Sequence, residues 1–272
     1  PLQPPAGPEL PRGGRTLFPG YELVGFCGTP GGGVALGRLE GNLPVKARML
    51  QSYADKYAVN RKIMPVFELI AVVVQSGAGS DGKYRRRVND AAVEEYLREA
   101  RAARALLLLN IQPGQSDFLT EVRQFDKWLH EPDVGVALDP EWAMKPGQKP
   151  GKVYGQTTGE MINDVAAYLS SIVTEGNLPE KALVFHQVHT CVVKDESAIR
   201  PYPGVATIKS VDGLGPKSAK IKTYDYLMGF TSKGVHAGFK LFFDEDRQNG
   251  GQLMTPAEVL ALAPPPEYVM YE

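Results

Sequence analysis

The chain has 272 residues, of which 43% are hydrophobic and 22% are charged, as is typical of a globular domain. Its 30 lysines and arginines against 31 acidic residues leave a net charge of -1. This gives no support to a nucleic-acid or membrane-surface role, because phosphate binding normally leaves a basic patch. No apolar run approaches the roughly 20 residues that span a bilayer.

The first part of the chain reads PLQPPAGPELPRGG, a Pro- and Gly-rich stretch typical of a linker. We therefore divide the chain into an N-terminal segment or linker, 1–18, and one folded domain, 19–272. Such a stretch is also typical of the region that follows a removed signal or anchor. We expect an exported protein, either extracellular or in the cell envelope.

Apolar segments that favour strands recur along the chain, at 21–27, 66–75, 105–111, 134–138, 182–188, 205–211, 234–243 and 268–271. Helical patterns separate most of them, at 46–57, 89–104, 116–130, 158–174, 218–228 and 255–262. This alternation predicts an α/β fold, with a parallel sheet covered by helices. The count of eight predicts a single (β/α)8 TIM-like barrel, since an open sheet needs no particular number of strands.

An open dinucleotide-binding sheet is the alternative fold. The glycine-rich stretch after the first strand reads GTPGGG, residues 28–33, which is not the G-x-G-x-x-G spacing of that fold. We interpret it as a loop on the active face of the barrel.

In such barrels the functional site lies where the strands end at their C-terminal side. Polar and aromatic side chains follow most of the predicted strands, namely Asn110, Gln112, Trp142, Gln187, His189, Asp212 and Tyr271. Amides and acids hydrogen-bond sugar hydroxyls, and flat aromatic rings pack on the apolar face of a pyranose. This mixture predicts a polysaccharide or oligosaccharide ligand.

Residue parity along a strand predicts which of these side chains reach the site. Asn110 and Gln112 share one face. Gln187 and His189 share a face that we expect to point to the barrel mouth, and His186 lies on the other face, where a core or helix contact is the commoner role. Arg85-Arg86-Arg87 is a short basic run in a Gly/Asp loop, and we expect it to be a solvated charge run at the entrance to a helix.

The fourth strand ends in VGVALDPEW, residues 134–142, where an apolar run stops at a carboxylate. On an extended strand Asp139 and Glu141 would point to one side, with Cα atoms about 6.6 Å apart. Their carboxyl groups then reach separations of about 5–9.5 Å, which glycosidases use. An apolar neighbour such as Trp142 would keep one carboxyl protonated as the general acid. The alternative is an acidic turn in which Pro140 ends the strand.

This D-x-E at the end of the fourth barrel strand resembles the barrel muramidases of glycoside hydrolase family 25, and it is similar in spirit to the DxxDxDxE strand end of family 18 chitinases. In the muramidase family the Glu of this motif is assigned as the acid and the Asp assists it. The resemblance therefore implies Glu141 as the acid and Asp139 as its partner. The first strand departs from that family, because GFCGTPGGG has no carboxylate where the family has an Asp.

We therefore expect a glycoside hydrolase-like enzyme that cleaves a cell-wall or other polysaccharide, without a cofactor. Glu141 is the expected acid, and Asp139 and Asp244 are the expected base or stabiliser. Two alternatives stay open. One is a non-catalytic glycan-binding barrel of the cell envelope. The other is a metal-dependent hydrolase that uses His189, Asp212 and Asp244, although no CxxC or His/Cys cluster indicates a metal site.

Overall fold

The computed structural model describes residues 7–272, so residues 1–6 of the N-terminal segment lie outside the description. The strands are β1 (Tyr21–Gly28), β2 (Lys62–Val74), β3 (Arg85–Arg87), β4 (Leu106–Ile111), β5 (Val134–Leu138), β6 (Thr157–Thr158), β7 (Lys181–Gln187), β8 (Val193–Lys194), β9 (Val205–Val211), β10 (His236–Leu241) and β11 (Tyr268–Tyr271). The α-helices are α1 (Leu43–Ala54), α2 (Asp90–Ala102), α3 (Phe118–Arg123), α4 (Asp126–Leu129), α5 (Gly159–Gly176), α6 (Lys217–Met228) and α7 (Pro256–Leu260).

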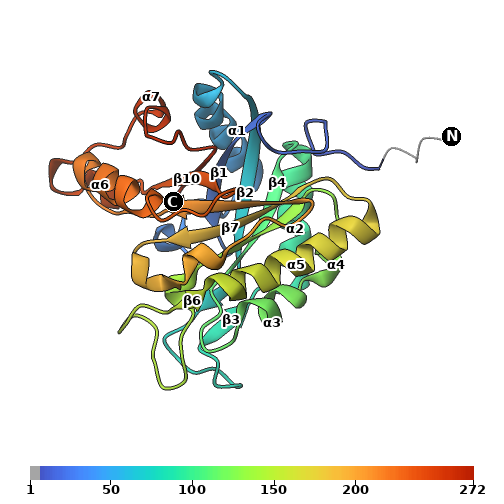
Figure 1. The fold of residues 1–272 in the computed structure, drawn as a ribbon, viewed down its shortest axis with the longest axis vertical. Helices are drawn as coiled ribbons and strands as arrows, with labels where there is room; N and C mark the ends of the chain where they lie inside the picture. Colours follow the sequence, from blue (N-terminus) through green and yellow to red (C-terminus); the bar gives the residue numbers. More distant parts are fainter. Residues whose placement is uncertain (1–6) are drawn as a thin grey trace.

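Eight of these strands form a closed parallel barrel, with helices packed around it (Figure 1). Going around the barrel, the order is β1, β2, β4, β5, β7, β9, β10 and β11. β1 pairs in parallel with β2 on one side and with β11 on the other, so the sheet has no open edge between them. The predicted (β/α)8 TIM-like barrel is confirmed, and each of its strands corresponds to a predicted one.

Local side chains set where the helices begin. The side chains of Asn42, Asn89 and Thr158 accept hydrogen bonds from backbone N–H groups in the first turns of α1, α2 and α5. Thr255 starts α7 with a reciprocal capping box to Glu258 and a proline in the first turn. These caps satisfy donors that have no partner within the helix.

The barrel strands bury both faces, which separates the core into two parts. Inside the barrel, apolar side chains such as Leu23, Met64, Leu108, Val184 and Met270 pack on one another. The side chains of the opposite parity form a second core between the barrel and the helices. A strand with both faces buried reads as a continuous apolar run, and this explains why the strands were visible in the sequence.

The segment before β1 packs against the barrel. Leu10 and Leu17 are 3% and 0% exposed, and they join the interior core beside Tyr21 and Leu106, the first interior residues of β1 and β4. The Leu17 N–H also donates to the Glu180 carboxylate, at 2.6 Å. From Leu10 onward the proline-rich segment therefore covers the N-terminal end of the barrel.

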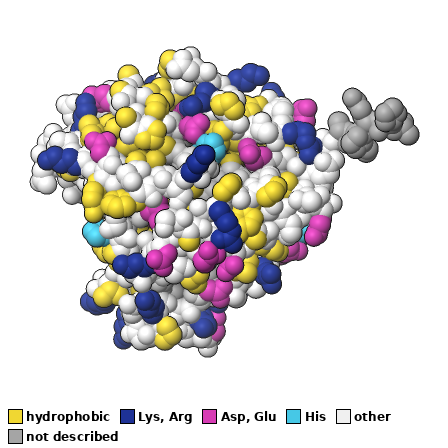
Figure 2. Space-filling view, viewed as in Figure 1, with side chains coloured by type: hydrophobic (Ala, Val, Ile, Leu, Met, Phe, Trp, Pro, Cys, Tyr) yellow, Lys and Arg dark blue, Asp and Glu magenta, His cyan; other side chains and the backbone are white. Residues whose placement is uncertain are grey.

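The face of the molecule seen in Figure 2 has basic and acidic side chains interspersed, in line with the balanced charge of the chain. Within residues 7–272, no helix has both the length and the apolar character needed to cross a membrane.

Candidate functional site

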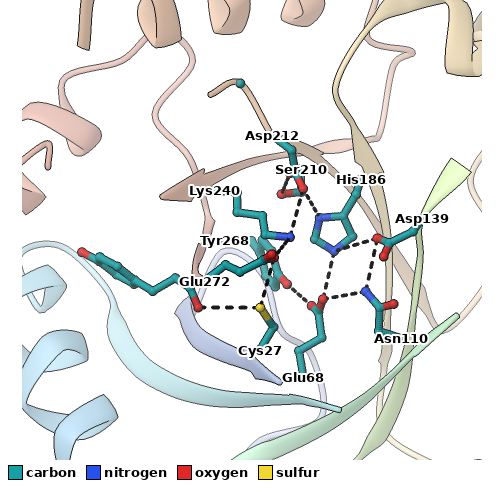
Figure 3. A network of polar contacts seen from close by, with 12 residues as sticks. Cys27, Glu68, Asn110, Asp139, His186, Ser210, Asp212, Lys240, Tyr268 and Glu272 are labelled. Carbon is teal, nitrogen blue, oxygen red and sulfur yellow. Dashed lines mark hydrogen bonds and ion pairs between the residues drawn. The ribbon is translucent and has the colours of Figure 1, made fainter. Parts of the chain in front are cut away.

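A layer of polar side chains lies inside the C-terminal end of the barrel (Figure 3). Every barrel strand contributes to it, most of them from the last interior position or from the residue just beyond the strand, whereas Glu68 lies in the middle of β2 and Tyr268 is the first residue of β11. The members are Cys27, Glu68, Asn110, Asp139, His186, Ser210, Asp212, Lys240, Tyr268 and Glu272. Since parallel strands end at one rim of a barrel, residues far apart in the sequence meet here.

A cavity of about 480 Å³ opens above this layer. Its polar lining consists of Glu68, Asn110, Gln112, Asp139, Glu141, Asp212, Thr223, Lys240 and Glu272. Apolar and aromatic side chains complete the wall, among them Trp142, Tyr154, Leu214 and Phe242. A concave site of this size with several convergent polar groups fits a small molecule or one or two sugar rings.

His186 sits at the centre of the layer, fully buried, between two carboxylates (Figure 3). Its Nδ1 lies 2.9 Å from Asp212 Oδ2, and its Nε2 lies 3.1 Å from Glu68 Oε1. Burial disfavours the charged ring, but Asp212 and Glu68 outweigh it and raise the pKa of His186 well above its usual value. The ring is therefore an imidazolium that donates to both carboxylates.

Lys240 supplies the second buried positive charge. Its Nζ lies 2.6 Å from Glu272 Oε2 and 3.3 Å from Asp212 Oδ2. Burial acts against the ammonium form, but Glu272 and Asp212 raise the Lys240 pKa well above normal. Burial would raise the pKa of Asp212, yet His186 and Lys240 lower it below its ordinary range. Asp212 is thus held as a carboxylate by two cations and by the Ser210 hydroxyl, which donates at 2.8 Å.

Asp139 and Glu141 are held differently from each other. Asp139 accepts hydrogen bonds from Asn110 Nδ2 at 3.3 Å and Gln112 Nε2 at 3.0 Å. Glu141 Oε2 is buried and has no hydrogen-bond partner among residues 7–272. Burial raises the Glu141 pKa well above normal, and the charges of Asp139 and Asp212 raise it further. Burial also raises the pKa of Asp139, but His186 and Lys240 oppose that change.

The two carboxyls consequently have separate roles available to them. The raised pKa of Glu141 favours its protonated form, and the residue is part of the cavity wall. Asp139 is the more readily ionised member, fixed by two amide donors. A pair of titratable groups with pKa values pushed apart is the arrangement that general acid catalysis requires.

Six of the predicted site residues line the cavity together, namely Asn110, Gln112, Asp139, Glu141, Trp142 and Asp212. The expectation that Asn110 and Gln112 share a face is confirmed, because both donate to Asp139. The expectation that Asp139 and Glu141 both lie on an extended strand is wrong. The strand ends at Leu138, and Pro140–Trp142 form a 3-10 turn, so parity along an extended strand does not place Glu141.

The expected orientation of β7 is wrong. Ala182 and Val184 point into the barrel, and His186 follows them by alternation. Gln187 is buried outside the cavity lining, and its Nε2 lies 3.5 Å from the His189 carbonyl. His189 is exposed, and its Nδ1 accepts a hydrogen bond from the Cys191 N–H.

Tyr271 and Asp244 also lie outside the cavity. The Tyr271 ring packs among the helices, stacked on Phe243, and its hydroxyl lies 2.7 Å from that of Tyr57. The next residue, Glu272, takes the interior position instead. Asp244 lies beyond the end of β10, with its side chain 56% exposed, and it pairs with Arg38 at 2.8 Å.

Sequence reasoning missed Glu68, Lys240 and Glu272, and it placed His186 on the wrong face. Glu68 and Lys240 each stand alone in an apolar run, VFELIAVVV and GFKLFF. A lone charge in a strand with both faces buried must be paired, since an unpaired buried charge is very costly. Applied to the sequence, this rule would have predicted Glu68 and Lys240 as paired members of the layer.

The three side chains considered for a metal site do not converge. Asp212 is in the interior layer, whereas His189 and Asp244 are on the surface. Over residues 7–272, no group of three or more His, Cys, Asp or Glu side chains is arranged to hold a metal ion.

Comparison of the chain with protein-family models and with curated proteins finds no match to either.

Proposed function

We propose that this protein is a glycoside hydrolase that cleaves a cell-wall or other polysaccharide outside the cell, with Glu141 as its general acid. The observation that carries the proposal is the Glu141 carboxyl. The residue is half-buried, one of its carboxyl oxygens is buried without a partner among the described residues, and it lines the same open cavity as Asp139. A carboxylic acid kept protonated near an ionised carboxylate is the arrangement of glycosidic bond cleavage.

Five residues of the cavity have a role in this chemistry. Glu141 donates its proton to the glycosidic oxygen as the bond to the anomeric carbon breaks. Asp139, fixed by Asn110 and Gln112, stabilises the positive charge that develops on the sugar, or activates the attacking water. Trp142 offers a ring on which the apolar face of a sugar packs.

Reducing-sugar release from a panel of cell-wall and storage polysaccharides tests the proposal. Glu141→Gln keeps the shape of the side chain and removes its titratable proton, so we expect release to fall at least about 100-fold. Asp244→Asn is the matched control, because it removes an exposed carboxylate outside the cavity and should leave release unchanged. For the wild type, kcat/KM should fall on the alkaline side, at a pH well above 4.5, as Glu141 ionises.

Circular dichroism and thermal unfolding of both variants check that the fold is intact. Equal release by wild type and Glu141→Gln would assign the acid to another group and overturn the mechanism. Binding of a glycan without any turnover would overturn the hydrolase proposal in favour of a glycan-binding barrel.

A further inference from the structure

A second hollow adjoins the cavity. It has a volume of about 330 Å³ and is lined by Glu141, Trp142 and residues 151–154 of the loop that follows β5. Glu141, Trp142 and Tyr154 line both spaces. Glu141 therefore lies on the boundary between two adjoining spaces.

The two spaces differ in chemistry. The first holds the carboxylates and amides of the interior layer. Among the described residues that line the second, Glu141 is the only carboxylate and Lys152 the only cation, and the other side chains are Trp142, Val153 and Tyr154. Val153 and Tyr154 are 49% and 60% exposed. Large apolar side chains that stay exposed together beside a cavity mark a binding surface.

The direction of proton transfer assigns the two spaces. In the proposed reaction the sugar that becomes positively charged must lie against Asp139, which lines only the first cavity. The proton from Glu141 goes to the oxygen of the departing group, on the opposite side of the breaking bond. The bond between the anomeric carbon and the glycosidic oxygen breaks, and the leaving oxygen keeps the electron pair and takes the Glu141 proton. Water adds its OH to the anomeric carbon and gives its other proton to Asp139.

We infer that the hollow formed by Trp142 and residues 151–154 is the leaving-group subsite, and that it takes a flat, apolar-faced group, either the apolar face of a pyranose or an aryl ring. Trp142 and Tyr154 supply ring faces for it, and Val153 supplies an apolar edge. The ring faces of Trp142 and Tyr154 and the Val153 side chain make up the apolar part of this space, so we expect recognition here to depend on stacking. This inference rests on the proposed hydrolase function.

The chain has two tryptophans, and this allows a direct binding test. Trp128 is buried at a distance from the hollow, with its indole N–H donating to Glu94, so Trp128→Phe leaves Trp142 as the sole reporter. We would titrate this variant with 4-nitrophenyl glycosides of common hexoses and N-acetylhexosamines in both anomers. The methyl glycosides of the same sugars are the matched probes without a ring.

We expect the aryl glycosides to quench Trp142 fluorescence and to bind more tightly than their methyl counterparts. Tyr154→Ala should weaken aryl binding about 3- to 10-fold and weaken methyl glycoside binding by a smaller factor, since Tyr154 also lines the first cavity. Tyr226→Ala is the control, since Tyr226 is 59% exposed on α6, away from both spaces, and should change neither. Thermal unfolding checks that Trp128→Phe folds.

Kinetics on the glycosides that are cleaved separate this inference from the proposed function. A Tyr154→Ala variant whose KM rises more for aryl glycosides than for methyl glycosides supports the subsite. If hydrolysis depends on Glu141 but does not change in Tyr154→Ala, the leaving-group subsite is wrong and the proposed hydrolase function is retained. Failure of the wild type to cleave any glycoside or polysaccharide would overturn the hydrolase, and the leaving-group role with it.

Discussion

His186 links the charges of the interior layer into one unit. It is fully buried and lies within hydrogen-bond distance of Asp212 and Glu68, while Lys240 neutralises Asp212 from the other side. Tyr268 adds a hydroxyl donor to Glu68. Such a network is stable only when every member is satisfied, because removal of one partner leaves another buried charge alone.

We expect His186→Gln to lower the free energy of unfolding by about 3–5 kcal/mol at pH 6, because two buried carboxylates lose a cation. This difference in the free energy of unfolding between wild type and His186→Gln should depend on pH. The folded-state pKa of His186 lies above the ordinary 6.5, so its stabilisation is complete below pH 6.5 and declines as pH rises towards the folded value. The gap between wild type and variant should shrink by about 1.4 kcal/mol per pH unit above 6.5.

Urea unfolding of both proteins from pH 5.5 to 8.5 measures this gap. His130→Gln is the control, because His130 is a surface histidine beside Asp126 and lies outside the layer. A gap between wild type and His186→Gln that stays constant over this range would mean that folding does not shift the pKa of His186, which would contradict a buried imidazolium held by two carboxylates.

Single positions were the hardest part of the site to predict, for a geometric reason. One residue of parity decides whether a strand side chain enters the barrel or faces the helices. On β7 the sequence HQVH has polar residues of both parities, so polarity alone cannot distinguish His186 from Gln187. The interior small residues Ala182 and Val184 do fix the parity, but only once the barrel packing is known.

At the scale of elements, the strands were predictable and the short segments were not. A parallel strand buried on both faces is a contiguous apolar run, and β4 and β5 appear as such in the sequence. The predicted helix 116–130 is instead two short helices, α3 and α4, interrupted at Gln124 and Phe125. Its periodicity is the same with or without this break, so the spacing of apolar residues does not reveal it.

The basic run at 85–87 is another short segment that the sequence did not predict correctly. The expectation of a solvated charge run is wrong. The run forms β3, an antiparallel strand on the edge of β2. Arg85 and Arg87 donate to Glu121 of α3, whose side chain is fully buried, at distances of 2.7 to 3.0 Å. The partner is about 35 residues away in the sequence, and only the fold brings it there. This bidentate clamp ties the β2–β3 hairpin to α3.

We expect Glu121→Ala to lower the free energy of unfolding by about 3 kcal/mol, since it leaves two arginines without their buried carboxylate. Urea unfolding measures the change. The matched control is Glu160→Ala, which removes an exposed first-turn glutamate paired with Arg200 and should shift the transition little. Similar shifts for the two variants would show that the clamp contributes no more than a surface pair.

At the scale of the whole molecule, the two ends of the barrel have opposite characters. The C-terminal end is polar, charged and open to a cavity. The N-terminal end is apolar and is covered by Leu10 and Leu17. A barrel interior must be filled by side chains, and an apolar opening left to water would cost stability. The cover therefore belongs to the fold, and the polar end is free to carry chemistry.

This division predicts that the cover stabilises the barrel without taking part in the site. Leu17→Ala removes a fully buried side chain, so the free energy of unfolding should fall by about 2–5 kcal/mol, as measured by urea unfolding. At urea concentrations too low to unfold the variant, its hydrolysis or binding of glycans should stay as in wild type, because the cavity lies at the other end of the barrel.

Leu214→Ala, the control, makes the same chemical change at a 58% exposed position in the cavity wall. It should leave stability nearly unchanged and weaken glycan binding instead. If Leu17→Ala weakened binding as much as Leu214→Ala did, the two ends of the barrel would be coupled and the separation of cover from site would be wrong.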